Sequence, residues 1–86
     1  MKVYVYKYVW ENGRKFEGGA GVRVFANKEN ASATLKRDID EFIKSFMSYY
    51  DKEDITIEYN GEDFVTIDAN HYEDCITLTV EETELE

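Results

Sequence analysis

A single apolar stripe with helical spacing is the feature that most limits what this chain can fold into. The stripe recurs every three to four residues and consists of Leu35, Ile39, Phe42, Ile43, Phe46, Met47 and Tyr50. Asn27 or Asn30 can cap its start through a side-chain oxygen. The spacing predicts a helix over residues 28–51 that has one face to bury, and we expect this helix to lie across a sheet.

Residues 2–10 alternate strictly and predict a strand. One face carries Val3, Val5, Lys7 and Val9, and the other carries Tyr4, Tyr6, Tyr8 and Trp10. Because both faces hold large apolar area, we expect an internal strand. Our working assumption is that the valine face meets the helix, although Lys7 among the valines argues for the opposite orientation.

The segment between this strand and the helix is rich in glycine. Asn12-Gly13 predicts a hairpin turn, and Gly18, Gly19 and Gly21 predict a bulged or mobile stretch. Alternation resumes at Val22, so we expect the second strand over residues 22–26.

Three further strands are expected after the helix, over residues 55–58, 64–67 and 76–81. A two-residue Asn60-Gly61 loop would place the isoleucines of the first strand and the apolar residues of the second on opposite faces. A three-residue loop over 59–61, with Gly61 in the left-handed conformation, pairs residues whose numbers sum to 120 and gathers these side chains on one face. We therefore expect the second arrangement.

These elements predict an α+β fold with the order β-β-α-β-β-β, in which one amphipathic helix packs across one face of an antiparallel sheet. The 86 residues suit a single domain, and 43% hydrophobic and 15% aromatic residues argue against disorder outside the termini. The expected parts are a hairpin over 1–26, the helix over 28–51, an acidic meander over 54–82 and a tail over 83–86. Leu85 and Glu86 are either native or a cloning remnant.

Charge is strongly segregated along the chain. Residues 1–52 contain all ten Lys and Arg and seven acids, whereas residues 53–86 contain twelve acids and no Lys or Arg. The net charge of −9 therefore combines a mildly basic first part (+3) with a C-terminal part of −12.

Two interpretations of the acidic meander stay open. It can be a solvated sheet face that keeps the domain soluble, or a surface for a basic protein partner that normally holds nucleic-acid phosphates. Small acidic proteins of mobile elements that block restriction or CRISPR nucleases provide a class analogy for such mimicry. The residues expected to carry the contact are Glu58, Glu62, Asp63, Asp68, Glu73 and Asp74.

The aromatic row Tyr4, Tyr6, Tyr8 and Trp10 has two candidate roles, a second core layer or a face for self-association. Self-association through this row or through a sheet edge is the alternative function. Direct nucleic-acid binding is not expected, because base-stacking platforms lie in basic surroundings.

Other chemistry lacks the residues that it needs. Arg14, Lys15 and the nearby glycines match no phosphate-loop spacing. His71 and Cys75 are two of the four ligands that structural zinc needs. We expect no enzyme activity and no cofactor. The lone cysteine and the absence of a signal-like or membrane-spanning apolar run favour a cytoplasmic protein.

Overall fold

The computed structural model describes residues 1–13, 17–70 and 73–85. Its elements are β1 (Lys2–Asn12), β2 (Glu17–Phe25), α1 (Lys28–Met47), the short 3₁₀ helix η1 (Lys52–Asp54), β3 (Ile55–Tyr59), β4 (Phe64–Ala69) and β5 (Asp74–Glu84). The order β-β-α-β-β-β and the α+β class predicted from the sequence are confirmed.

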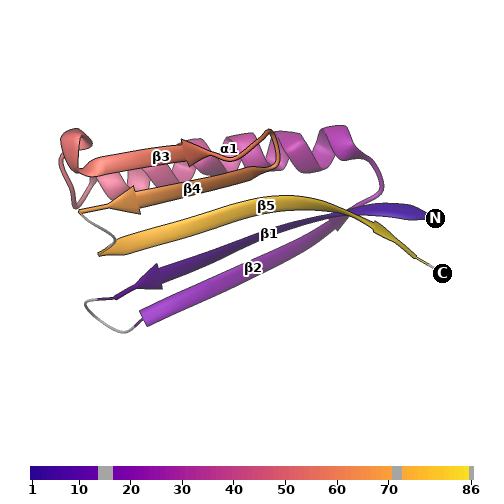
Figure 1. Cartoon of the computed structure of the whole chain (residues 1–86), viewed down its shortest axis with the longest axis horizontal. Coiled ribbons are helices and arrows are strands. Elements are labelled where there is room, and N and C mark those ends of the chain that lie inside the picture. The colour runs from indigo at the N-terminus through magenta and orange to yellow at the C-terminus, as the bar shows by residue number, and fades with distance from the viewer. Residues whose placement is uncertain (14–16, 71–72, 86) are drawn as a thin grey trace.

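The five strands form one antiparallel sheet with the order β2-β1-β5-β4-β3. β5 therefore lies between the β1–β2 hairpin and the β3–β4 hairpin. The first and last strands of the chain are paired near the centre of the sheet. Figure 1 shows α1 on one side of the sheet, with β2 and β3 at its two edges. The face without the helix is called the open face below.

Helix α1 begins where the sequence indicates. Asn27 has extended backbone angles, and its Oδ1 accepts a hydrogen bond from the Asn30 backbone N–H at 2.8 Å. The helix ends at Met47, earlier than expected, because the chain tightens there: the backbone N–H groups of Ser48 and Tyr49 donate to the carbonyls three residues back.

The aromatic row of β1, and not its valine row, meets the helix. Tyr6 is 1% exposed, its hydroxyl donates to Asp38 Oδ2 at 2.7 Å, and the rings of Tyr8 and Phe42 lie 5.2 Å apart. The working assumption about this strand was wrong, because rings as long as Tyr reach across to α1 while their hydroxyls find polar partners. Lys7 lies on the open face and pairs with Glu81 at 3.7 Å.

The glycine-rich segment belongs to a regular strand, which corrects the expected bulged or mobile stretch. β2 pairs with β1 residue by residue from Glu17 to Phe25. Gly21 lies opposite Tyr8, and a Cβ at Gly21 would stand 2.3 Å from the Tyr8 ring. The glycine is therefore needed for the close approach of this ring, which covers the strand in place of a side chain.

The β3–β4 hairpin confirms the predicted faces and corrects the predicted register. Ile57 pairs with Ile67, so paired residues sum to 124 and not 120, and the connection is the four-residue turn 60–63. Asn60 N–H donates to the Phe64 carbonyl at 2.9 Å, and Gly61 has the expected positive φ, 103°. Because the shift is an even number of residues, the apolar side chains still share the helix-facing side.

The core lies between that side of the sheet and α1. Its buried members come from every layer and include Leu35 and Ile39 of the helix and Ile67, Ile76 and Leu78 of the central strands. β5 is also longer than expected at both ends, beginning at Asp74 and including Thr83 and Glu84, which the sequence indicated as a tail. It thereby extends along all of β1.

Candidate functional site

The six acids predicted to contact a partner do not form one surface. Glu58 and Glu62 are exposed, Asp63 and Glu73 are half-buried, and Asp68 and Asp74 are buried. The buried, half-buried and exposed acids therefore have different roles in the fold.

Asp74 is an acceptor at the centre of a buried polar cluster. Its Oδ1 accepts from Asn12 Nδ2 at 2.7 Å and from Trp10 Nε1 at 3.2 Å, and its Oδ2 accepts from the Tyr50 hydroxyl at 2.5 Å. These donors come from β1 and from the segment after α1. Asp74 is 8% exposed, so it ties three parts of the chain together and is not available to a partner.

Asp68 lies on the open face, opposite Cys75 in β5 and Thr56 in β3. It is 6% exposed, and its Oδ1 has no hydrogen-bond partner among the described residues. Burial, a hydrogen bond to Asp68, and the charges of Asp68, Glu11 and Glu58 together raise the pKa of the Cys75 thiol to about 12. The thiol is therefore protonated at neutral pH, which is unsuited to nucleophilic attack.

Asp63 and Glu73 are both engaged by neighbouring side chains. Asp63 lies 3.6 Å from Lys28 Nζ, and Ser32 Oγ donates to it at 3.4 Å, which attaches the β3–β4 turn to the start of α1. Glu73 accepts from Asn70 Nδ2 at 2.5 Å. These two acids brace turns in the fold.

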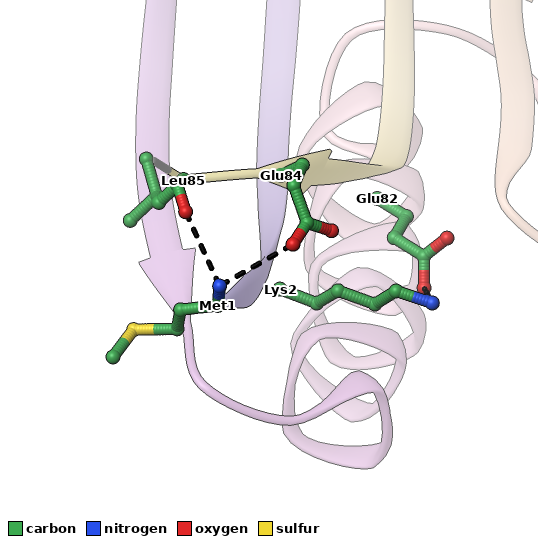
Figure 2. A network of polar contacts seen from close by, with 5 residues as sticks. All are labelled: Met1, Lys2, Glu82, Glu84 and Leu85. Atoms are coloured by element: carbon green, nitrogen blue, oxygen red, sulfur yellow. Dashed lines mark hydrogen bonds and ion pairs between the residues drawn. The ribbon is translucent and has the colours of Figure 1, made fainter.

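The acids at the end of β5 are neutralised by the start of β1. The N-terminal ammonium group donates to Glu84 Oε1 at 3.3 Å and to the Leu85 carbonyl at 3.2 Å, and Lys2 Nζ lies 3.8 Å from Glu82 Oε1 (Figure 2). Glu81 pairs with Lys7 in the same way. The antiparallel pairing of β1 with β5 therefore places the first cations of the chain against its last acids.

Five exposed carboxylates without an ion pair gather along the β3 edge of the sheet. We call this set the acidic edge, and it consists of Asp51, Glu53, Asp54, Glu58 and Glu62. All five are exposed, and within the described part of the chain none has a cation within ion-pairing distance. Lys52 is the one cation in residues 51–62.

The first three members of the acidic edge were absent from the sequence prediction. Asp51, Glu53 and Asp54 lie in and just before η1, between the helix and β3, where residue spacing carries no strand pattern. What identifies them is their position, because they directly precede β3, which the sheet order places at an edge. The nearby C-terminal end of α1 adds the partial negative charge of its free carbonyl groups.

The aromatic row does not form an exposed face. Tyr6 belongs to the core, and Tyr4, Tyr8 and Trp10 are partly buried against it. The rings belong to the core under the helix and not to the second core layer that the sequence suggested. We therefore do not propose self-association through this row.

The described residues hold no group of three or more His, Cys, Asp or Glu side chains arranged to bind a metal ion. His71 lies outside these residues, as do Arg14, Lys15 and Glu86. In the part of the chain that the structure describes, no helix has the length and apolarity needed to cross a bilayer.

Comparison with known proteins finds no matching family model, no matching curated protein and no matching solved structure. The function must therefore be argued from the charge and geometry of the described surfaces.

Proposed function

We propose that the domain is a non-enzymatic binding module that presents its acidic edge to a basic protein surface and acts there as a nucleic-acid mimic. The observation that carries the proposal is the separation of the acids into two groups. The described acids elsewhere in residues 53–86 have hydrogen-bond or ion-pair partners inside the fold, apart from the buried Asp68 Oδ1, whereas the five carboxylates of the acidic edge have no ion pair among the described residues.

The spacing of the acidic edge supports a partner that normally binds phosphates. A strand rises about 3.3 Å per residue, so the edge from η1 to the β3–β4 turn extends over roughly 20 Å. Five carboxylates over this length approach the density of one charge per ~3.4 Å along a single DNA strand. Glu58 lies on β3 and the other four carboxylates lie just before it or in the turn that follows it. These carboxylates repel one another, and a cationic groove relieves that repulsion.

The shape of the edge also suits a protein surface. β3 is the outermost strand on its side, so Glu58 and the acids of the flanking turns stand at a rim that a concave partner can enclose. Figure 1 shows β3 and the η1 turn at this margin, away from the β1–β2 hairpin. A basic groove can therefore contact the acidic edge without displacing α1.

The test is binding of a fluorescently labelled arginine-rich peptide, followed by anisotropy at increasing salt. We expect affinity to fall steeply as salt screens the contacts. The variant with Glu53→Gln, Glu58→Gln and Glu62→Gln should bind much more weakly. A matched variant with Glu81→Gln, Glu82→Gln and Glu84→Gln has the same net charge but alters acids that are already paired.

The comparison of these two variants decides the proposal. If the location of charge matters, the acidic-edge variant loses most of the binding and the matched variant loses little. Equal losses would mean that only net charge attracts the peptide, and salt-independent binding would exclude an electrostatic contact. A competition assay in which the domain displaces DNA from a basic DNA-binding protein then tests mimicry itself.

A further inference from the structure

The two edges of the sheet differ in how they are protected from pairing with another strand. β3 has five residues, follows a 3₁₀ turn and is flanked by acids, which are the usual devices that block edge pairing. β2 has nine residues, and its pairing with β1 continues without a bulge over its whole length. The chain contains no proline, and β2 contains no lysine.

The outer side of β2 is open to another strand. No described residue pairs with it, so its outward backbone N–H and C=O groups face away from the rest of the sheet. Its apolar side chains are exposed as well, with Val22 at 64% and Val24 at 61%. Gly18, Gly19 and Gly21 have no side chains to shield the backbone. An edge with these properties favours strand addition.

We infer that this edge pairs with β2 of a second copy of the chain, joining two five-stranded sheets into one continuous ten-stranded sheet. Two-fold symmetry requires antiparallel pairing, and it places both helices on the same face of the joined sheet. The inference is independent of the acidic edge and of any basic partner.

One symmetric register fits the side chains of β2 best. If Val22 pairs with Val22 of the second copy, Val24 lies opposite Ala20 and both apolar pairs share the open face. Arg23 then lies opposite Gly21, so the bulky cation faces a residue without a side chain. A shift of one residue would instead place Arg23 opposite Arg23, where like charges repel.

The distribution of charge also favours a second copy at this edge. Two molecules of net charge −9 repel each other most strongly if their acidic edges approach. Pairing through β2 leaves the two β3 strands at opposite ends of the ten-stranded sheet. At about 4.8 Å per strand they are roughly 40 Å apart. This distance is several times the screening length of about 8 Å at physiological salt, so repulsion there is weak.

The experiment is sedimentation equilibrium of the full chain over a range of concentrations, with two lysine variants. Wild type should reach twice the monomer mass, and the dimer should change little with salt. Val22→Lys places two cations opposite each other at the two-fold axis, so we expect the dissociation constant to rise by about tenfold or more. Val24→Lys, also at an exposed edge position, should act in the same direction.

Val9→Lys is the matched control. Val9 is 44% exposed on the same open face, but it lies in β1, one strand inside the edge. It should leave the dimer intact. Hydrogen exchange adds a second measurement: outward amides of β2 should gain protection as concentration rises in wild type but not in Val22→Lys. A wild-type monomer at millimolar concentration, or equal loss of the dimer in Val9→Lys, would overturn the inference.

Discussion

Asp74 and Glu58 come from the same acidic third of the chain, but the sheet gives them opposite environments. Asp74 accepts three hydrogen bonds in the interior, whereas Glu58 stands exposed on the edge strand. The difference arises from position in the sheet: Asp74 lies on the helix-facing side of central β5, whereas Glu58 lies on the open face of β3, which has a neighbour on one side only. Asp74 is therefore a structural element of the fold, and Glu58 is a surface charge.

Burial raises the pKa of the Cys75 thiol most, and buried Asp68 and exposed Glu11 and Glu58 raise it further. With a pKa of about 12 instead of 9, the folded thiol should react with a thiol reagent at pH 8 about a hundredfold or more slowly than the unfolded thiol. Asp68→Asn should accelerate the folded-state reaction more than Glu58→Gln does. Equal acceleration by the two variants would contradict the larger effect of Asp68 among these carboxylates.

The same shift in pKa predicts that the free energy of unfolding falls at alkaline pH. Above about pH 9 the unfolded thiol ionises while the folded thiol keeps its proton, so the folded state binds more protons. The contribution of the Cys75 thiol to the free energy of unfolding is therefore fully present below pH 9 and is lost as the pH rises towards 12. Urea unfolding at pH 8 and at pH 10 measures this fall, which should be smaller in Cys75→Ser. Desolvation and Asp38 raise the pKa of Tyr6 in the same direction.

Asp74→Asn should give the largest loss of stability among the acid variants. The new amide group points a donor at Asn12, Trp10 or Tyr50, which are themselves donors, and the free energy of unfolding should fall by about 2–3 kcal/mol. Urea denaturation measures it. The matched variant is Asp68→Asn. Because Asp68 Oδ1 lacks a partner among the described residues, this substitution should lower the free energy of unfolding by less than about 1 kcal/mol. The reverse ranking would contradict the comparison.

Tyr6→Phe should have a smaller effect, because one hydrogen bond is lost and the ring stays in the core. Removing the 2.7 Å contact with Asp38 should lower the free energy of unfolding by about 1 kcal/mol. Tyr59→Phe is the control, since Tyr59 is exposed at the end of β3. Thermal denaturation measures both variants. Equal melting temperatures for Tyr6→Phe and Tyr59→Phe would exclude a stabilising hydrogen bond from the Tyr6 hydroxyl.

The smallest effects are expected for the exposed acids, with opposite signs in the two regions. Glu82→Gln removes an exposed ion pair with Lys2 and should cost less than about 0.5 kcal/mol. Glu53→Gln relieves repulsion along the acidic edge, so it should leave stability unchanged or raise it by a few tenths of a kcal/mol. A clear loss of stability in Glu53→Gln would show that this acid has a partner in the fold.

The candidate site was only partly predictable from the sequence. The excess of acids after residue 52 is evident, and Glu58 and Glu62 were correctly expected at the surface. Counting charges cannot show that Glu82 and Glu84 meet Lys2 and the N-terminus, since these residues are at opposite ends of the chain. Without those pairings, the acidic edge cannot be separated from the other acids.

The sequence by itself determined the elements, because their signals are local: a 3.6-residue stripe for α1, alternation for the strands, and Asn27 and Gly61 at a cap and a turn. It also determined which residues of β3 and β4 share a face. Only the tertiary structure decided which face of β1 is buried, since both faces are apolar and the choice depends on contacts with Asp38 and Phe42. It likewise decided which acids have partners inside the fold, because β5 pairs with β1 and these two strands are far apart in the sequence.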